Sequence, residues 1–570
     1  MAYLLLFKYM FNCNETKDII EKEYNIITKN KKINSDLFSS LINIDCNQEA
    51  WIKSIKVDKN LFLVPTRRIT KSKNIYTELF NNKSLANSKN QTEINLMLYK
   101  EDIKQYGFKL TYEEYSKTIS IVSIYSLVKK INYLIIQKSL ETLLTYLEKN
   151  YYIKAFEINF DKKNKILTSI RKIGFKKQAE KDVNNSCKYV WNRIKKNIGK
   201  ELILTAGPAI SEKENFNAFL ASKYGWNKKY NGFIADLENK FAKYIGVKYA
   251  LATSSCTGAL HIALTALGIS KNDEVIVPDV SWIATARAVT YTNAKPVFAD
   301  IEYDTWNINI SSLLKCINKK TKAIIPVHMY GQPANILEIK KIAKKYNLKI
   351  IEDCAEAHGV EYKGKKVGSI GDVAAFSFFS NKTITCGEGG IVTTNSKDIA
   401  EKAQNLKNLA YGKVNKFIHD DVGFNYRLPN MSAAIGLAQL ENIDEVFLQK
   451  ERIYKRYTNN LKGVKGVEIP AIKDYAKYIM WVYNLSVNKD YPISRDALCK
   501  KLKEKNIDTR PCFTPINYQD HLINKYKKFK KEDCPNANAL MQNGFYLPSG
   551  NLIPDSDIDF VCEEIINLTK

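Results

Sequence analysis

The chain contains the stretch Ser377-Phe378-Phe379-Ser380-Asn381-Lys382-Thr383-Ile384-Thr385-Cys386-Gly387-Glu388-Gly389-Gly390, in which a single lysine lies among small hydroxyl residues and precedes a glycine cluster. Just upstream, Ile350-Ile351-Glu352-Asp353-Cys354-Ala355-Glu356-Ala357-His358-Gly359 places acidic residues at the end of an apolar run. Most lysines are solvated surface charges, and the chain has 87 lysine and arginine residues. The neighbours of Lys382 set it apart from these.

Three kinds of chemical group occur together around Lys382: an amine, an acid and a hydroxyl-rich turn. These are the groups that pyridoxal phosphate needs, because its aldehyde binds a lysine, its ring nitrogen faces an acid and its phosphate needs donors. Asp353 is the candidate acid, which would keep the ring nitrogen protonated. The residues therefore predict a pyridoxal-phosphate enzyme with Lys382 as the catalytic lysine.

A second stretch, Thr253–His261, is a candidate phosphate site, because an apolar strand ends in small hydroxyl residues where a helix begins. Free amides at a helix start bind a dianion well, although an ordinary N-cap also explains this pattern. Ser377 is a further candidate donor. Trp282 follows another strand, where its ring could stack on a flat cofactor or belong to the core.

Beyond residue 200, short apolar strands alternate with amphipathic helices. This alternation predicts an α/β fold with a parallel sheet covered by helices on both faces, with the site beyond the carboxyl ends of the strands. The expected elements are strands at 249–253, 274–278, 295–300, 323–327, 349–353 and 391–394, and helices at 257–268, 285–290 and 336–346. A long helical pattern runs from about 437 through 460.

At 570 residues the chain is too long for one ordinary core. Only three of its 24 glycines lie in the first 200 residues, which indicates a change of domain near residue 200. We expect a separate α+β domain at 1–180, a polar, helical linker at 181–204, a cofactor-binding large domain at 205–440 and a small α+β subdomain at 441–570.

The composition excludes several classes of protein. The net charge of +27 comes from scattered lysines without an arginine stripe, so we expect no nucleic-acid partner. Eleven cysteines without paired spacing argue against a metal site and a disulfide framework, and are typical of reduced thiols in a cytoplasmic protein. No apolar run approaches the ~20 residues that span a membrane.

Residues from about 205 to 568 resemble the DegT/DnrJ-type sugar aminotransferases, which have the type I fold of pyridoxal-phosphate transferases, with a parallel-rich seven-stranded sheet between helices. The matching stretches are Ser254–Leu264, Pro278–Val289, Val327–Gln332, Glu352–Gly359, Gly368–Phe378, Lys382–Gly390 and Gly423–Leu428. Within the family, Asn381–Thr385, Arg510–Phe513 and Leu547–Ser549 are most similar to perosamine-synthase-like members.

The resemblance implies roles at the cofactor ring. Lys382 would hold the cofactor covalently, Asp353 would pair with the ring nitrogen, and Trp282 would stack on the ring. Glu356 would lie beside the ring oxygen, at a position where many relatives have glutamine. Some relatives carry histidine in place of the lysine and dehydrate their substrates, and the lysine retained here argues against that reaction.

The resemblance also implies a phosphate site shared between subunits. Thr257, Ser377 and the amide of Cys256 would hold the phosphate, and Asn425 would reach the phosphate of a neighbouring subunit, which makes a homodimer part of the site. Cys256 and Cys386 stand where glycine or threonine is commoner in the family. Candidate substrate contacts within or near the matching stretches are His328, Tyr330, Arg427 and Phe513.

The implied reaction is amino transfer from L-glutamate to C4 of a nucleotide-linked 4-keto-6-deoxyhexose, for surface polysaccharides such as a lipopolysaccharide O-antigen. Three alternatives stay open: amination at C3, a bifunctional aminotransferase and N-acetyltransferase, and a regulatory protein that keeps the fold without turnover.

The first domain weakly resembles GNAT acyltransferases. Tyr151–Ile158 and Asn164–Lys176 correspond to the closing strand, helix and Gly-Phe turn, and Ile121–Val128 and Gln137–Lys149 to the central strand and cofactor helix. An acyl-CoA site needs backbone amides at a glycine-rich turn, but Lys130–Gln137 has no glycine. We therefore expect a degenerate domain, with an active N-acyltransferase that uses acetyl-CoA as the alternative.

Overall fold

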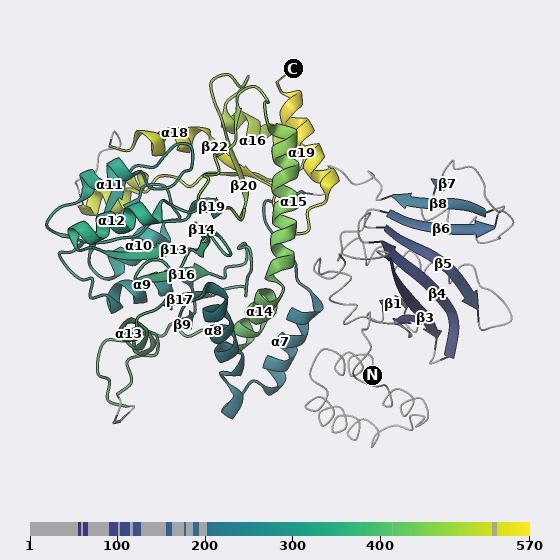
Figure 1. Cartoon of the computed structure of the whole chain (residues 1–570), viewed down its shortest axis with the longest axis horizontal. Helices are drawn as coiled ribbons and strands as arrows, with labels where there is room; N and C mark the ends of the chain where they lie inside the picture. Colours follow the sequence, from purple (N-terminus) through teal and green to yellow (C-terminus); the bar gives the residue numbers. More distant parts are fainter. Residues whose placement is uncertain are drawn as a thin grey trace. The chain divides into compact units, whose positions relative to one another are not determined.

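The computed structural model (Figure 1) describes the chain from residue 202 to 569, apart from 413, 416 and 527–532, together with eight strands between residues 55 and 192. The chain forms two compact units, Met1–Lys196 and Asn197–Lys570. Among the described residues, no helix has the length and apolarity needed to cross a bilayer.

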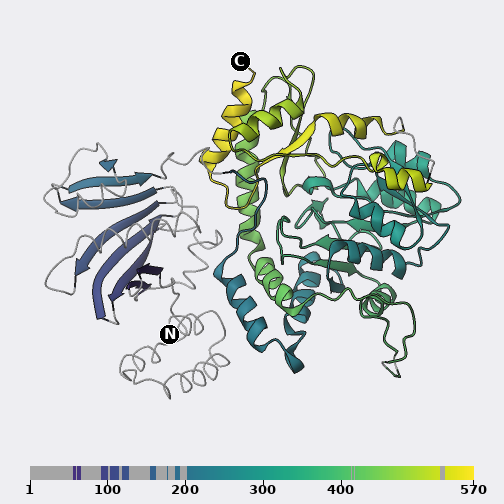
Figure 2. The ribbon, with the colours of Figure 1, turned by 180° about the vertical axis from the view of Figure 1, so that it is seen from behind.

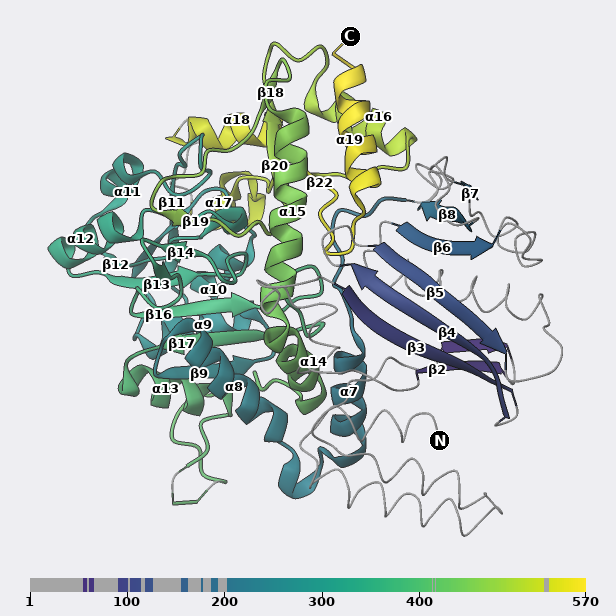
Figure 3. The same ribbon diagram turned by 45° about the vertical axis from the view of Figure 1, so that its right-hand side comes forward.

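The described strands of the first unit form one sheet in the order β1-β2-β3-β4-β5-β6-β8-β7 (Figures 2 and 3). The strands are β1 (Ile55–Asp58), β2 (Leu61–Pro65), β3 (Gln91–Lys100), β4 (Ile103–Glu113), β5 (Thr118–Ser126), β6 (Ala155–Asp161), β7 (Lys176–Lys177) and β8 (Ser186–Asn192). Neighbouring strands are antiparallel except β5 and β6, which are parallel.

The parallel pair in this sheet separates along its length. β5 pairs with β6 only from Thr118 to Ile121, although β5 continues beside β4 to Ser126. β6 likewise continues beside β8 to Asp161. The two strands therefore part at their carboxyl ends in the middle of a sheet.

One prediction for this region is wrong. The helical linker expected at 181–204 contains β8, which pairs with β6 over its whole length. The residues explain the error, because Tyr189, Val190 and Trp191 are β-branched or aromatic and favour strands, whereas the flanking lysines dominate the helical pattern. The expected helix at 137–149 and the turn at 174–175 lie outside the described residues.

The second unit is built on a seven-stranded sheet in the order β11-β10-β12-β13-β16-β17-β9. Its strands are β9 (Tyr249–Thr253), β10 (Glu274–Pro278), β11 (Lys295–Ala299), β12 (Thr321–Ile324), β13 (Lys349–Asp353), β16 (Val373–Ser377) and β17 (Gly390–Thr394). From β11 to β16 all pairings are parallel, and β17 runs antiparallel to both of its neighbours. The predicted parallel-rich sheet is confirmed.

Helices cover both faces of this sheet (Figure 1). Alternate residues of a strand point to opposite faces, and Ile350 and Ile351 of β13 accordingly belong to different apolar cores. The first core includes residues of α8 (Gly232–Ile245), α12 (Ile336–Tyr346) and α14 (Asn430–Glu441). The second includes residues of α9 (Cys256–Ala266), α10 (Ala284–Tyr291) and α13 (Lys397–Lys407).

The long helical pattern near residue 440 consists of two helices. α14 ends at Glu441 and α15 (Ile443–Leu461) begins after Asn442, whose φ of −107° and ψ of 14° are not helical. α15 leads into a subdomain with its own core. This subdomain contains the sheet β18-β20-β22-β21, with β18 (Val467–Glu468), β20 (Tyr483–Val487), β21 (Arg510–Pro511) and β22 (Gly544–Leu547), and the helices α16 (Arg495–Glu504) and α19 (Asp555–Asn567).

Two buried acids attach the C-terminal segment to the strand ends. Asp279, just after β10, accepts the N–H of Asn517 at 2.9 Å. Asp300, just after β11, accepts the N–H groups of Asn536 and Ala537 at the start of α18 (Pro535–Asn543). Burial raises the pKa of Asp279 to about 7, against the partly compensating hydrogen bond from Asn517. The charged form of Asp279 is therefore costly in the folded chain.

We predict that Asp279→Asn changes the pH dependence of stability. The folded-state pKa is raised, so wild-type stability falls as pH rises from about 4 to about 7, by on the order of 4 kcal/mol at 1.36 kcal/mol per pKa unit. Asparagine keeps the acceptor oxygen without the charge. Urea unfolding should show a gain for Asp279→Asn that is ~2–3 kcal/mol larger at pH 8 than at pH 5, while the exposed Asp398→Asn changes stability similarly at both.

Candidate active site

The strand register brings the predicted residues to one edge of the sheet. Ser377, the last residue of β16, lies opposite Gly390 of β17, which in turn lies opposite Thr253 at the end of β9. Asp353 ends β13 and pairs with Ala375 of β16. The topology therefore gathers the lysine loop, the acid and the start of α9 at the carboxyl ends of the parallel strands, as the sequence predicts.

The start of α9 is capped by Ser255. Its hydroxyl accepts the N–H of Gly258 at 3.1 Å, so the N-cap interpretation is correct for this residue. Cys256 and Thr257 follow in the first turn, where backbone N–H groups point out of the helix end. A Cβ on Gly390 would lie 2.5–2.6 Å from the backbone of Ser255 and Cys256. Glycine is therefore required for β17 to approach this helix start.

Asp353 is a buried acid with two hydrogen bonds. It accepts the hydroxyl of Thr285 at 2.8 Å and the N–H of Ala355 at 3.1 Å, and Thr285 in turn contacts the Ser281 hydroxyl at 2.7 Å. Burial raises the pKa of Asp353 and outweighs these hydrogen bonds and the nearby charge of Lys382. A protonated ring nitrogen would stabilise its charged form, so Asp353 fits the expected cofactor.

Lys382 lies in a small cage of side chains. Its side chain is 10% exposed, and Nζ lies 3.5 Å from Oε1 of Glu356 and 3.8 Å from the ring centroid of Trp481. The second carboxylate oxygen of Glu356 accepts the N–H of Tyr330 at 3.0 Å. Burial raises the pKa of Glu356, and Lys382 opposes this shift. Trp481 was not among the residues predicted for the site.

Aromatic rings line one side of the site. Trp282 is 61% exposed, and its ring centroid lies 5.7 Å from that of Phe513. Phe513 lies 5.5 Å from the ring of Tyr330, which stacks on Trp481 with an interplanar angle of 18°. Trp282 is thus exposed enough for a flat ligand to reach its ring, whereas the ring of Tyr330 is buried.

His328 is fully buried behind the site. Its Nδ1 accepts the N–H of Ala334 at 3.1 Å, so its proton is on Nε2, which donates to Glu352 at 3.1 Å. Glu352 also accepts the N–H groups of Gly368, Ile370 and Gly371. Although Cys354 lies close enough to complete a set of metal ligands, these bonds already engage His328 and Glu352. His328 therefore supports the backbone rather than facing a substrate.

Asn425 and Arg427 are exposed on the segment that follows a long loop. The N–H of Ser254 donates to the carbonyl of Tyr426 at 2.8 Å, which holds this segment beside the end of β9. Arg427 donates to the side chain of Asn408 at 2.9 Å. Both predicted residues thus lie near the start of α9 but face outward in a single chain.

Three features of the site were not predicted from the sequence: the contact of Thr285 with Asp353, the contact of Trp481 with Lys382, and the buried hydrogen bonds of Glu352. Thr285 was only part of a predicted helix, and Trp481 lies about 100 residues beyond Lys382 in a run of apolar residues that has the pattern of a core strand. The position of Glu352 in an alternating strand was an available signal, because its side chain must point away from that of Asp353.

Known proteins resemble the second unit over almost their whole length. GDP-perosamine synthase of Escherichia coli O157:H7 is 41% identical over 354 residues, which cover 62% of this chain and 94% of that protein. The dTDP-3-amino-3,6-dideoxy-alpha-D-galactopyranose transaminase of Aneurinibacillus thermoaerophilus is 34% identical and covers 59% of this chain and 89% of its own length.

The fold has solved counterparts too. An aminotransferase of Psychrobacter cryohalolentis matches with a TM-score of 0.61 and 26% identity, covering 63% of this chain and 97% of that structure. Residues 209–566 match the family described as the DegT/DnrJ/EryC1/StrS aminotransferase family. Because this match covers more than half of the chain and includes every residue of the site, the chain belongs to the DegT/DnrJ/EryC1/StrS aminotransferase family.

Proposed function

We propose that the chain transfers the amino group of L-glutamate to C4 of a nucleotide-linked 4-keto-6-deoxyhexose, for surface polysaccharide synthesis. The observation that carries this proposal is the placement of Lys382, whose Nζ lies between the Glu356 carboxylate and the Trp481 ring at the strand ends where Asp353 lies. Nucleotide-sugar aminotransferases among its relatives support the substrate class.

The cofactor is pyridoxal phosphate, which, when bound, supplies a ring that stabilises negative charge on the carbon next to the transferred nitrogen. Asp353 would keep the ring nitrogen protonated, and the exposed Trp282 would stack on the ring. Thr257, Ser377 and the amide of Cys256 would hold the phosphate.

Lys382 moves the proton in both halves of the reaction. Its free amine takes the α-proton of glutamate as a base and later returns a proton to the sugar carbon as an acid. The carboxylate of Glu356 lies 3.5 Å from Nζ and holds the amine in one position for both proton transfers. Amination at C3 would use the same residues, with C3 of the sugar in the position that C4 occupies otherwise. This alternative stays open because one relative is a transaminase named for a 3-amino sugar.

We predict that Lys382→Ala abolishes covalent cofactor binding and lowers turnover by about 10³-fold or more, because no other group at this position can move the proton. The assay supplies glutamate with a panel of nucleotide-linked 4-keto and 3-keto sugars and identifies products by mass spectrometry. Lys341→Ala, on the exposed face of α12, is the control. Turnover by Lys382→Ala at the wild-type rate would refute the proposal.

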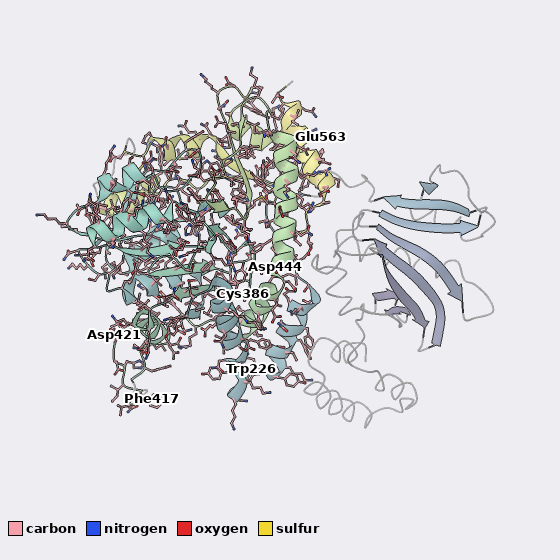
Figure 4. All side chains as sticks on the ribbon, in the orientation of Figure 1. Trp226, Cys386, Phe417, Asp421, Asp444 and Glu563 are labelled. Carbon is pink, nitrogen blue, oxygen red and sulfur yellow. The ribbon has the colours of Figure 1, made fainter. Side chains whose placement is uncertain are left out.

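We also propose a homodimer with shared active sites. The loop between α13 and α14 exposes apolar side chains, and Figure 4 shows Phe417 and Asp421 on the part of it that projects beyond α13. Its exposed apolar residues are Tyr411, Val414, Phe417, Ile418 and Val422. Clustered apolar exposure of this kind marks interaction surfaces. A second copy that covers this loop would receive Asn425 near its own phosphate site.

A complementation experiment tests this arrangement. Lys382→Ala and Asn425→Ala should each be inactive alone, but a mixed dimer has one site with an intact Lys382 and the partner's Asn425. Random exchange of subunits should then restore about a quarter of wild-type activity. Activity that stays at the level of the separate variants, although exchange is verified by mass, would place Asn425 in its own subunit's site or outside it.

A second candidate function concerns the unit Met1–Lys196. The separation of β5 and β6 after Ile121 and Ile158 opens backbone N–H and C=O groups to an extended, amide-bearing ligand. Acyl-CoA has such an arm, and the amino sugar offers an amine. The family match begins only at residue 209, so the resemblance to GNAT acyltransferases remains a prediction.

If this unit is an N-acyltransferase, the sugar amine attacks the acetyl-CoA thioester, forms an amide and releases CoA with a free thiol. On this alternative, CoA release depends on the amino-sugar product and is measured by a thiol reagent with the full chain. Lys382→Ala, supplied with ready-made amino sugar, should release CoA as well as the wild type does. The absence of release from both proteins would support the degenerate domain instead.

A further inference from the structure

Trp481 makes two kinds of contact with the lysine loop. Its ring face lies 3.8 Å from Nζ of Lys382, and its indole N–H donates to the carbonyl of Asn381 at 2.7 Å. One side chain therefore holds both the charged end of Lys382 and the main chain immediately before it.

The carbonyl on the other side of Lys382 is held from the same subdomain. The side-chain amide of Asn551 donates to the carbonyl of Thr383 at 3.4 Å, and Asn551 is buried. Residues 381 and 383 are thus both hydrogen-bonded to side chains that lie beyond α15 in the sequence. These two bonds limit the rotation of the peptide units that flank the lysine.

Trp481 is itself fixed in place. It is buried, its ring stacks on Tyr330, and its carbonyl accepts Nζ of Lys450 at 2.8 Å. Lys450 also donates to the carbonyl of Ser549 at 2.7 Å. Lys450 thus joins the main chain on the Trp481 side of the cage to the main chain near Asn551.

We propose that Trp481 is a positioning residue for Lys382, and that it holds the amine beside Glu356 and ready for the cofactor aldehyde. A lysine side chain has four flexible bonds, and a cation over a tryptophan face is attracted to it. The hydrogen bond to Asn381 fixes the base of the same side chain. This inference rests on the proposed function, because it specifies how the catalytic amine of that site is held.

The test measures cofactor capture by the full-length, cofactor-free protein. Pyridoxal phosphate is added. The amine of Lys382, after giving a proton to the buffer, condenses with the aldehyde and releases water, and borohydride added at set times reduces the C=N bond to a stable amine. Peptide mass spectrometry then gives the rate of labelling at Lys382. The variants are Trp481→Leu, Trp481→Phe and Asn551→Ala. The control is Tyr483→Phe on β20, which removes a hydroxyl that lies 3.2 Å from the Thr458 hydroxyl of α15.

We expect Trp481→Leu to slow labelling of Lys382 by about 10-fold. Trp481→Phe keeps an aromatic face but loses the N–H, and Asn551→Ala loses one hydrogen bond, so each should slow it by about 3-fold. In turnover assays kcat should fall by similar factors with little change in the KM for the nucleotide sugar. Tyr483→Phe should label at the wild-type rate.

The outcomes separate this inference from the proposed function. Failure of the wild type to capture the cofactor at Lys382 would refute the proposed function. Capture by the wild type and, at equal rates, by Trp481→Phe and Asn551→Ala would refute the positioning role, and this comparison holds even where Trp481→Leu does not fold. Equal slowing by Tyr483→Phe would also refute it, because the effect would then be a general loss of packing.

Discussion

The site depends on two adjacent buried carboxylates at the end of β13. Neighbouring residues of a strand point to opposite faces, so Glu352 faces the loop at 368–371 and Asp353 faces Thr285. Burying a carboxylate is costly unless hydrogen bonds compensate. For Glu352, His328 and the backbone amides outweigh the effect of burial, and its pKa lies below the usual range. For Asp353 the effect of burial is larger than that of its hydrogen bonds, and its pKa is raised. The charge of Glu352 is therefore compensated within the protein, whereas a cationic ligand would stabilise the charged form of Asp353.

The fold was predictable where local pattern and tertiary packing agree. The apolar runs at 249–253, 274–278 and 349–353 become β9, β10 and β13 with the expected bounds, because each is short, buried and followed by a turn. The pattern of apolar residues gave the wrong prediction where polar residues lie next to the structured segment. Helix was predicted where β8 lies, because lysines surround its aromatic residues. The break at Asn442 between α14 and α15 was not predicted, because no proline or glycine occurs there.

The site was predictable to the extent that its residues follow strands. Asp353, Ser377 and Thr257 come directly from the strand ends and the helix start, so their convergence follows from the topology of a parallel sheet. His328 and Tyr330 lie in a stretch typical of the family, but both side chains are buried. Nε2 of His328 donates to Glu352, and the ring of Tyr330 stacks on Trp481. Trp481 and Asn551 had no local signal, because their contacts with the lysine loop arise only when the C-terminal subdomain packs on the sheet.

This packing also determines the medium in which the predicted residues act. Trp481 belongs to an apolar cluster with Val280, Val327, Met329 and Tyr330, which lies where the C-terminal subdomain meets the strand ends. Apolar surroundings have a low dielectric constant, which strengthens the attraction between Lys382 and Glu356 relative to the same pair in water. The Trp481 ring lies over the amine of Lys382, whose side chain is only 10% exposed, and attracts it through the ring face. The apolar and aromatic residues of this cluster, which take no part in the reaction itself, therefore determine how strongly the amine of Lys382 is held.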